Sequence, residues 1–570
     1  MRSLQKATGE KSVDIQTPEL GEQGDYSSNI AMQLFSQFPI SNFQFPIKDI
    51  KNPRQLAEKI VEKLNEDKDL KKIVDKIEVA GPGFINFWLK KEVLVSELTK
   101  VLSEAEKYGS SNLGKGKTVV IDYSSPNIAK RFGIGHLRST IIGQALYNLY
   151  SFLDYKAIGD NHLGDWGTQF GVLLAQISNI KYQISNLTID KLEELYVEFN
   201  KKAEENPRLW DEARNWFKKL EEGDKDARKI WKEIVEISVK DFERIYDVLG
   251  INIDNAYGES FYEDKMPQAI NLLRKKGLTK KSEGAEIVEL SKLTPAILVK
   301  SDGATTYYTR DLATLKFRIQ EWNPDLIIYE VGSEQTLHFR QLFETAKLLG
   351  LDKGRRLIHV AHGLIRFKSG KMSTRRGQTI KLEDVLNEAT LRAKKIIKAS
   401  ETSRGLSNNQ QVEVAKVVGI GAIKYFDLMH HPASDIIFEW EKMFVLEGNS
   451  APYLQYTYAR CQSVLRKATF KGGSLQGTYN LNQKVNKEEG FLLRAFVHFP
   501  EVIEDAAKNF SPNLVCNYLF DLAQKFNTFY NNHRIIGSDQ ENARLAITSA
   551  TGQILKNGLK LLGIDTPERM

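Results

Sequence analysis

Short apolar runs alternate with helical patterns over much of the chain from Thr118 onward. The runs are TVVIDYS, YKAIG, DLIIYEV and RLIHVAH, and each is followed by a turn and by apolar residues at helical spacing. Short continuous apolar runs between turns are typical of strands that are buried on both faces. This alternation predicts a parallel sheet covered by helices, which we assign to residues 111–404.

The hydrophobic pattern differs in three other parts of the chain. Residues 1–110 mix helical and strand patterns and predict an α+β domain. Between about 178 and 276 the strand patterns stop, and long charged helical patterns predict an insertion in the sheet domain. Residues 405–570 carry apolar and aromatic residues almost purely at helical spacing, which predicts an all-α helical bundle.

Three segments of the N-terminal region have clear local patterns. GDYSSNIAMQLFSQF predicts a capped helix over 24–38, and PRQLAEKIVEKLNE predicts a second helix over 53–66 with its proline near the start. KIEVAGPGFINFWL predicts two strands joined by a Gly-Pro-Gly turn over 76–89.

Length and composition narrow the class of protein. The chain has 570 residues, 41% hydrophobic and 27% charged, which indicates several globular domains rather than a disordered, collagen-like or rod-like chain. No apolar stretch reaches the roughly 18 to 20 residues of a membrane span, and the N-terminus lacks the apolar segment of a secretory signal. We therefore expect a cytoplasmic protein with no membrane contact.

The cysteines and the net charge narrow the class of protein little further. Cys461 and Cys516 form neither a spaced metal motif nor a disulfide framework, so we expect both to be buried and predict no dedicated metal site. The formal net charge is 80 − 73 = +7, which is compatible with a polyanionic partner but does not demand one. Basic and acidic residues alternate over 201–221, as on a solvated helical face.

The most informative stretch is TVVIDYSSPNIAKRFGIGHLRSTIIGQALYNLYSFL at 118–153, which predicts a strand, a turn and a helix. Gly133 and Gly135 let a ligand approach the backbone, and His136 adds a donor beside the free N–H groups of the helix start. Such a site suits a triphosphate. A glycine pair before a helix is also an ordinary tight turn, so the motif alone leaves both interpretations open.

Lys130 strengthens the phosphate interpretation. It follows a strand end at a turn, from which its side chain can reach the same phosphates as His136. An ammonium group there would offset negative charge that develops during attack at an α-phosphate.

A second basic segment, FKSGKMSTRRGQTI at 367–380, follows an apolar strand. Such a loop could close over phosphates, although most basic loops are simply solvated. TTYYTRDLATLKFR at 305–318 places Tyr307 and Asp311 on one face if it is helical. A carboxylate beside an aromatic ring suits a planar guanidinium.

The spacing around Asp311 also allows a plainer interpretation. On a surface helix the carboxylate could pair with Arg310 or Lys316, which are close to it in the sequence. Spacing alone does not decide between these two possibilities.

In their order along the chain, these motifs resemble those of arginyl-tRNA synthetases, a class I family with a Rossmann-type catalytic domain. SSPNIAK followed by GHLRST resembles the family's signature region, in which the second histidine of a His-Ile-Gly-His motif falls on His136. Gly133 stands in place of the first histidine, so one imidazole donor to ATP is missing. The loss of one preorganised donor can cost on the order of 100-fold in rate.

KMSTRRG resembles a variant of the family's Lys-Met-Ser-Lys-Ser loop, with Lys371 as the first lysine and Thr374 in the place of the second. A lysine upstream of the histidine motif compensates in the family, and Lys130 occupies its position. The resemblance thus implies catalytic roles for Lys130, His136 and Lys371. The ATP-binding residues that it implies are Gly133, Gly135, His136, Lys371, Met372 and Ser373, with Mg²⁺ bound to ATP.

The same resemblance implies an arginine pocket. Its residues would be Asp122, Asn127, His136, Tyr307, Asp311 and Gln335. Asp122 lies where many members have glutamate, which keeps the charge but shortens the reach. Two further family-like stretches have less clear roles: DNHLGDWGTQFG, with His162, Asp165 and Trp166, could line the site or only pack, and Glu259 in GESFY could face the substrate amine or solvent.

The flanking regions resemble the additional N-terminal domain and the helical anticodon-binding domain of the family. The residues implied to bind tRNA, by stacking or hydrogen bonding with exposed bases, are Phe84, Asn86, Tyr453, Gln455, Tyr456 and Arg460. Phe87 is a further candidate, although core packing is expected for at least one of the two phenylalanines.

The resemblance covers nearly the whole chain and implies that L-arginine, ATP and tRNA(Arg) are its substrates. ATP would activate arginine to arginyl-adenylate, and the 3′ end of the tRNA would then receive the arginyl group, on a monomeric enzyme. Two alternatives remain open: a class I synthetase for another amino acid, and a tRNA-binding paralogue that has lost catalysis, which Gly133 motivates.

Overall fold

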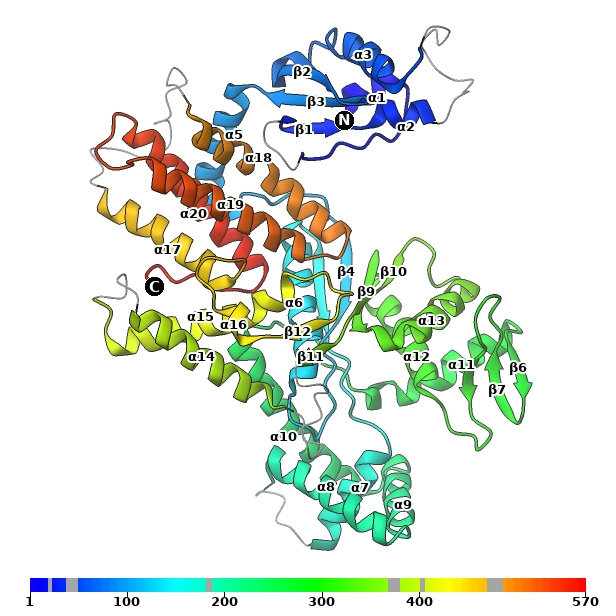
Figure 1. The fold of residues 1–570 in the computed structure, drawn as a ribbon. Helices are drawn as coiled ribbons and strands as arrows, with labels where there is room; N and C mark the ends of the chain where they lie inside the picture. Colours follow the sequence, from blue (N-terminus) through cyan, green and yellow to red (C-terminus); the bar gives the residue numbers. More distant parts are fainter. Residues whose placement is uncertain (19–22, 37–49, 181–186, 368–379, 400–404, 469–484) are drawn as a thin grey trace. The chain divides into compact units, whose positions relative to one another are not determined.

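The computed structural model describes the chain except residues 19–22, 37–49, 181–186, 368–379, 400–404 and 469–484 (Figure 1). The chain divides into two compact units. The first contains Met1–Tyr108, Cys461–Phe499 and Asp521–Ile554, and the second contains Gly109–Arg460, Pro500–Phe520 and Leu555–Met570.

The N-terminal part of the first unit is α+β. Its sheet has the order β1-β3-β2, with antiparallel neighbours. The elements are α1 (Arg2–Thr8), β1 (Tyr26–Ser28), α2 (Ile30–Ser36), α3 (Pro53–Leu64), α4 (Leu70–Ile73), β2 (Val74–Ala80), β3 (Phe84–Leu89), α5 (Lys91–Glu104) and η3 (Ala105–Lys107).

Two of the three local predictions for this region are confirmed, and one is wrong in part. The helix over 53–66 and the strand pair over 76–89 form as α3 and as β2 with β3. The helix predicted over 24–38 is confined to Ile30–Ser36 among the described residues. Its first residues form β1 instead, because pairing with β3 satisfies their backbone groups.

Four long helices follow near the C-terminus. They are α17 (Ala451–Lys467), α18 (Lys487–Lys508), α19 (Asn513–Asn532) and α20 (Glu541–Leu561). Both cysteines lie on these helices and are buried, as predicted. Many apolar and aromatic residues of these helices are buried, so their helical spacing reflects packing in a core.

A four-stranded parallel sheet forms the centre of the second unit, in the order β10-β9-β4-β5. The strands are β4 (Thr118–Asp122), β5 (Lys156–Asp160), β9 (Leu326–Gly332) and β10 (Arg356–His362). Helix α6 (Leu137–Phe152) joins β4 to β5, and α13 (Thr336–Leu349) joins β9 to β10. The predicted Rossmann-type sheet is confirmed.

The direction of winding reverses between two central strands. From β4 the chain continues to β5 on one side, whereas β9 on the other side of β4 continues to β10. In open parallel sheets, ligands bind at the carboxyl ends of the strands where the order reverses. The carboxyl ends of β4 and β9 are therefore where the fold favours a ligand.

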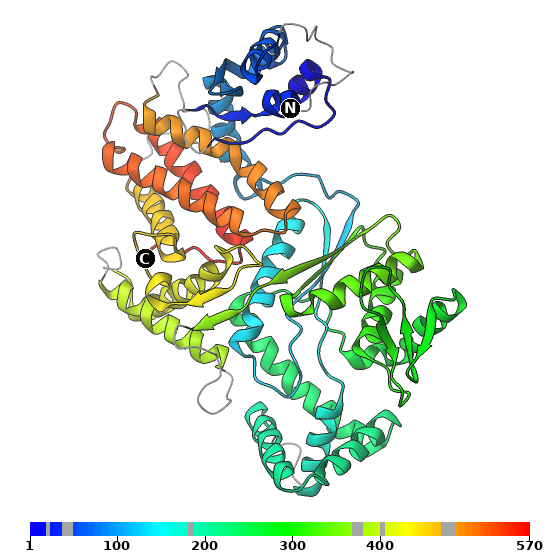
Figure 2. The same cartoon turned by 45° about the vertical axis from the view of Figure 1, so that its right-hand side comes forward.

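The predicted helical insertion is also present. It consists of α7 (Thr168–Ile180), α8 (Ile189–Glu205), α9 (Leu209–Glu221) and α10 (Lys225–Leu249), which group together in Figures 1 and 2. Charged residues of the 201–221 stretch are mostly exposed, which confirms a solvated face.

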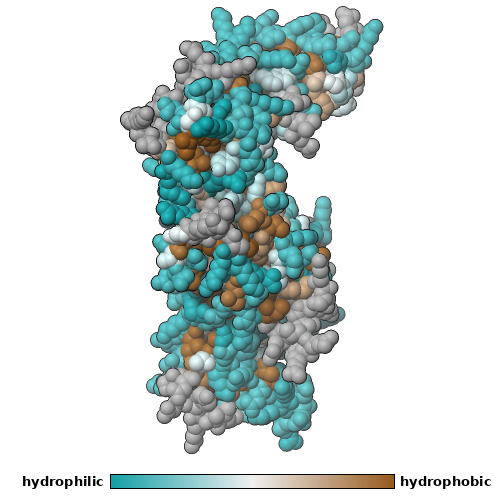
Figure 3. Space-filling view, turned by 60° about the vertical axis from the view of Figure 1, so that its left-hand side comes forward, coloured by the Kyte–Doolittle hydropathy of each residue, from teal (hydrophilic) through white to brown (hydrophobic). Residues whose placement is uncertain are grey.

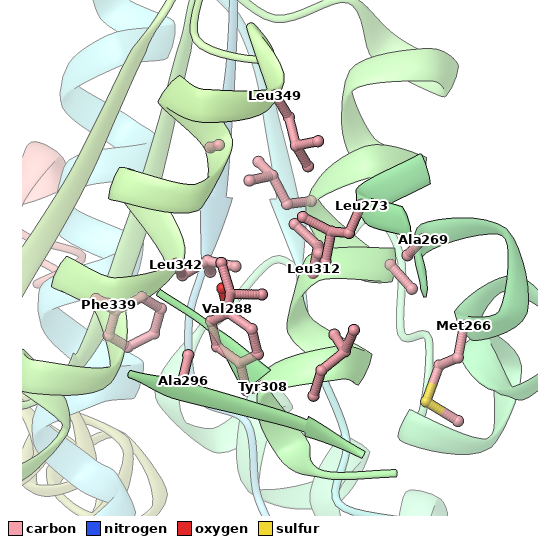
Figure 4. Close-up of a cluster of buried hydrophobic side chains, with 14 of the residues drawn as sticks. Met266, Ala269, Leu273, Val288, Ala296, Tyr308, Leu312, Phe339, Leu342 and Leu349 are labelled. Carbon is pink, nitrogen blue, oxygen red and sulfur yellow. The ribbon is translucent and has the colours of Figure 1, made fainter. Parts of the chain in front are cut away.

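A small antiparallel sheet was not predicted from the sequence. It contains β6 (Thr279–Ser282), β7 (Ala285–Val288) and β8 (Ala296–Val299), and it follows η6 (Glu259–Lys265) and α11 (Met266–Lys275). Its strands are short, and the first of them, TKKS, has no buried residue, so the apolar pattern is weak. The buried cluster in Figure 4 joins this sheet to α11, α13 and α12 (Tyr307–Trp322) through Leu273, Val288, Leu312 and Leu342.

The end of the second unit is not purely helical. Helices α14 (Leu382–Ala399) and α15 (Asn408–Leu428) are followed by β12 (Ile436–Phe438) and α16 (Trp440–Met443). Strand β12 pairs in parallel with β11 (Ile365–Phe367), which lies just after the main sheet. Strand β12 is a short exception in the predicted helical region 405–570, because it completes a pair begun in the sheet domain.

The face shown in Figure 3 is mostly hydrophilic, with apolar residues in separate groups. Among the described residues, no helix is both long and apolar enough to cross a bilayer.

Candidate active site

Chemically active side chains collect along one edge of the parallel sheet. Asp122 ends β4, Asp160 ends β5, and Gly332 ends β9. In the sheet register Asp122 lies beside both Asp160 and Tyr329. Because parallel strands end on the same edge, the segments that follow these strands converge at the point where the winding reverses.

Arg318 lies buried beneath this edge and has no exposed surface. From α12, its Nη2 lies 2.8 Å from Asp122 Oδ2, and its Nε donates to Asp160 Oδ2 at 2.7 Å. Its guanidinium also lies over the Tyr329 ring, 5.2 Å from the centroid. Burial acts to lower the pKa of Arg318, but the two carboxylates raise it well above its usual value, so the guanidinium stays charged.

Sequence reasoning missed Arg318. The available signal was its spacing, since Arg318 follows Asp311 by two helical turns on the same helix. Asp122 was predicted to bind substrate arginine, but in this structure one of its oxygens faces Arg318 and the other accepts a hydrogen bond from Ser125 at 3.1 Å. Contact between Asp122 and a substrate stays a prediction.

Asp311 lies one turn after Tyr307 in α12, as their spacing predicted for a helix. Its Oδ2 is 2.5 Å from Nε2 of His338, and its Oδ1 is 3.8 Å from Nε2 of His162. Burial acts to raise the pKa of Asp311, but the hydrogen bond and charge of His338, with His162, lower it overall. The carboxylate is therefore ionised.

Asp311 was also considered as a surface residue that pairs with Arg310 or Lys316, and this interpretation is wrong, because both residues contact other side chains. Arg310 lies 3.3 Å from Glu259, and Lys316 donates to Gln268 at 3.2 Å. Glu259 is only 9% exposed, and this burial raises its pKa to about 7 although Arg310 opposes the shift. Glu259 is thus a buried group that pairs with the helix of the predicted arginine pocket.

The DNHLGDWG stretch mainly holds segments together. Asp165 accepts hydrogen bonds from the Ser260 amide at 2.8 Å and from its hydroxyl at 2.6 Å, and Trp166 is buried against Trp231. Gly164 pairs with Asn127 as an isolated bridge, and a Cβ on Gly164 would lie 2.2 Å from the Asn127 amide oxygen. A larger residue at position 164 would therefore require the Asn127 side chain to move.

His136 closes a short helical turn, η4 (Ile134–His136), directly before α6. The Gly133 amide donates to its Nδ1 at 3.2 Å. Burial, and to a lesser extent the Lys130 ammonium, lower the pKa of His136. A Cβ on Gly135 would meet nothing within 4 Å, so the backbone is open to a ligand at that position.

Several predicted site residues face solvent. Lys130 is exposed, with its Nζ 5.8 Å from the centroid of the Tyr196 ring on α8. Tyr307 is 66% exposed, and Asn127 and Gln335 are exposed as well. Gln335 ends η7 (Ser333–Gln335), which directly follows β9. These side chains are accessible to a ligand at the carboxyl edge.

The second basic loop lies almost entirely outside the described residues. The predicted ATP-binding residues Lys371, Met372 and Ser373 lie outside the described residues. The strand before them, β11, ends at Phe367.

In the first unit, one residue predicted to bind tRNA is exposed and another is buried. Phe84 is 38% exposed at the start of β3. Asn86 is 5% exposed, and its amide oxygen accepts a hydrogen bond from Ser27 at 2.7 Å. Phe87 is buried, which confirms core packing for one of the two phenylalanines.

The predicted tRNA contacts on α17 also differ in exposure. Arg460 lies over the ring of Tyr456, 4.8 Å from its centroid, and both are partly exposed. Tyr453 is partly exposed and packs against Phe520. Gln455 is fully buried and donates to the Asp565 carbonyl at 2.7 Å.

Comparison with known proteins agrees with this architecture. Residues 97–440 match the model of the class I tRNA synthetase (R) catalytic domain, 454–570 that of the DALR anticodon binding domain, and 2–89 that of the arginyl tRNA synthetase N terminal domain. The chain belongs to the arginyl-tRNA synthetase family. The resemblance predicted from the motifs is therefore confirmed.

Relatives of this family match along almost the entire chain. An arginine–tRNA ligase of Halothermothrix orenii is 40% identical over 564 residues, which cover 98% of this chain and 95% of the relative. One from Clostridioides difficile is 41% identical with the same coverage.

No described group of three or more His, Cys, Asp or Glu side chains is arranged as a metal site.

Solved structures of the family share the fold. The arginyl-tRNA synthetase of Plasmodium falciparum superposes with a TM-score of 0.83 at 28% identity, covering 100% of this chain and 97% of that one. That of Thermus thermophilus gives 0.81 at 21% identity, covering 100% and 99%, and so supports the fold alone.

Proposed function

We propose that this chain ligates L-arginine to tRNA(Arg) at the expense of ATP. The observation that supports this most directly is an ionised carboxylate, Asp311, on a helix tied by Arg318 to the strand that leads into the His136 motif. This supports a guanidinium site and a triphosphate site at the same sheet edge. Membership of the family gives the reaction that joins these two ligands.

In the first step, an arginine carboxylate oxygen attacks the α-phosphorus of ATP. A new phosphorus–oxygen bond forms, the bond to the β-phosphate breaks, and pyrophosphate leaves. His136, neutral because burial lowers its pKa, would donate an N–H to the phosphates, while Lys130 and Lys371 would offset their charge. In the second step the terminal ribose hydroxyl of the tRNA attacks the arginyl carbonyl, and AMP leaves.

Substrate arginine would be held by its charge and planarity. Asp311 would supply the anionic acceptor, Tyr307 an aromatic wall one helical turn away, and Gln335 an amide at the end of η7, which directly follows β9. Asp122 at the end of β4 and Asn127 in the segment after it would complete the pocket. A guanidinium offers several donors in one plane, whereas a lysine ammonium is a point charge, so this set favours arginine.

Other ligands follow from the same proposal. ATP would lie against Gly133, Gly135 and the loop with Met372 and Ser373. Mg²⁺ would arrive bound to the triphosphate and neutralise part of its charge. Phe84, Tyr453, Tyr456 and Arg460 would contact tRNA, and the enzyme would act as a cytoplasmic monomer.

The reaction is tested by ATP–pyrophosphate exchange and tRNA charging with purified protein. We expect exchange with arginine, dependent on tRNA(Arg), and charging with arginine but not with lysine or glutamine. Charging with lysine or glutamine instead would indicate a synthetase for another amino acid. Tight tRNA binding without exchange would indicate a paralogue that has lost catalysis.

The role of Lys130 is tested by Lys130→Ala. We expect the rate of adenylate formation to fall on the order of 100-fold, because a charge that stabilises the transition state is lost, while tRNA affinity changes little. Lys202→Ala, at another exposed lysine, is the matched control and should leave both quantities unchanged. Equal losses of activation rate and tRNA affinity in the Lys130 variant would argue against its assigned role.

A further inference from the structure

The carboxylate of Asp311 has unequal neighbours at its two oxygens. Oδ2 lies 2.5 Å from His338 Nε2, a short hydrogen bond, whereas Oδ1 lies 3.8 Å from His162 Nε2, beyond hydrogen-bond distance. His338 occupies the first turn of α13, and His162 follows β5. Of these two imidazoles, one therefore fixes an oxygen of Asp311 and the other does not.

The position of the His338 ring is set by packing. It lies edge-on to Tyr308 with centroids 6.3 Å apart, and to Phe339 with centroids 5.3 Å apart. Tyr308 and Phe339 are both buried in the cluster between α12 and α13 (Figure 4). The Tyr308 hydroxyl is hydrogen bonded to Thr345 on α13. The direction of the His338 N–H is thus determined by the core below it.

An aspartate carboxylate needs such a partner to act as a directional acceptor. The last torsion of an aspartate side chain has a broad, roughly twofold preference, so the carboxylate plane is weakly defined by the side chain itself. A guanidinium binds best when its N–H groups lie in that plane. One short hydrogen bond at Oδ2 restricts the plane, while Oδ1 stays beyond hydrogen-bond distance of His162.

We propose that His338 is a positioning residue for arginine recognition, which holds Asp311 Oδ2 so that Oδ1 receives the substrate guanidinium. This inference rests on the proposed function, because it assumes that Asp311 binds arginine. His338 acts through Asp311 and touches neither ATP nor the reacting atoms. Its loss should therefore weaken arginine binding selectively.

The test compares three substitutions at position 338 in tRNA charging. His338→Leu removes the donor and should raise KM for arginine on the order of 10-fold, with kcat and KM for ATP nearly unchanged. His338→Asn is too short to reach Asp311 and should behave like the leucine variant. His338→Gln places an N–H at a reach similar to Nε2 and should recover most of the loss.

His359→Gln is the matched control. This imidazole lies on β10, where its Nε2 is 3.0 Å from the Val331 carbonyl rather than beside Asp311. Thermal unfolding midpoints of all variants separate a folding defect from a binding defect. In an Asp311→Asn background, His338→Leu should raise the KM for arginine less than twofold further. The carboxylate through which His338 acts is already absent in that background.

Two results would overturn the inference. One is an unchanged arginine KM in both folded His338→Leu and His338→Asn proteins that charge tRNA normally. The other is a rise in the KM for arginine that glutamine does not rescue, or that is matched by the KM for ATP. If the wild-type protein does not charge arginine at all, the proposed function fails instead.

Discussion

The helical insertion and the carboxyl edge of the sheet use the same charged residue types in opposite ways. On the insertion, Lys202 pairs with Glu198 at 2.7 Å, and both side chains are about half exposed, at 55% and 49%. At the sheet edge, Arg318 lies within 2.8 Å of Asp122 and Asp160, and none of the three is more than 8% exposed. The distances between the charged groups are alike in the two regions, but one set is exposed to solvent and the other is buried.

Burial changes what such a pair contributes. An exposed pair is worth roughly 0 to 1 kcal/mol, because water and salt screen it. A buried pair must first overcome the cost of removing both charges from water, so it is weak evidence for stability. Stability alone is therefore a weak explanation for the buried charges at the carboxyl edge of the sheet, and perturbed ionisable groups do cluster at functional sites.

Burial alone does not mark the site. Arg138 and Asp427 form an equally buried pair, 1% and 4% exposed, that joins α6 to α15. What distinguishes Arg318 is that its carboxylate partners end the neighbouring strands β4 and β5, and β4 is one of the two strands between which the winding of the sheet reverses.

The largest expected effect comes from breaking the buried group. Arg318→Leu would leave Asp122 and Asp160 as neighbouring carboxylates without a counter-charge, and should lower the free energy of unfolding by about 3 to 5 kcal/mol. Urea denaturation measures this change. Adding Asp122→Asn and Asp160→Asn should restore much of the stability. A loss below about 1 kcal/mol for Arg318→Leu would show that the buried group behaves like a surface pair.

A smaller effect is expected from Glu259 as pH changes. Its pKa is raised by burial from 4.5 to about 7, so between these values the folded chain holds a proton that the unfolded chain has released. Stability should therefore fall as pH rises through this window, by up to about 3 kcal/mol, and level off above it. Glu259→Gln should remove this part of the pH dependence. Parallel stability curves for both proteins from pH 4.5 to 8 would contradict the shift.

The smallest effect is expected on the insertion. Arg214 pairs with Asp211 one helical turn away, and both side chains are more than 60% exposed, at 63% and 64%. Arg214→Gln should change the free energy of unfolding by less than about 1 kcal/mol, and added salt should reduce that difference further. A cost comparable to that of Arg318→Leu would remove the contrast between the two regions.

The sequence was sufficient to predict features that depend on local pattern. Buried parallel strands have continuous apolar runs, and the helix with Tyr307 and Asp311 has the spacing of one face. It was insufficient where partners come from elsewhere. His338 is 27 residues from Asp311, and Arg318 is 158 residues from Asp160, so no local spacing links them.

The same reason explains the errors in the fold. Residues 26–28 and 436–438 become strands only because distant segments, β3 and β11, offer edges to pair with. Short polar strands such as TKKS at 279–282 carry almost no periodic signal of their own.

The amide that Gly133 directs at His136 Nδ1 determines where the ring carries its proton. A neutral imidazole that accepts at Nδ1 must be the Nε2–H tautomer, and so presents its N–H on the far side of the ring from Gly133. Any residue except proline at position 133 can supply this amide, since the bond uses only the backbone. Glycine in place of the first histidine therefore removes one side chain from the motif, but the backbone amide at this position still sets the tautomer of His136.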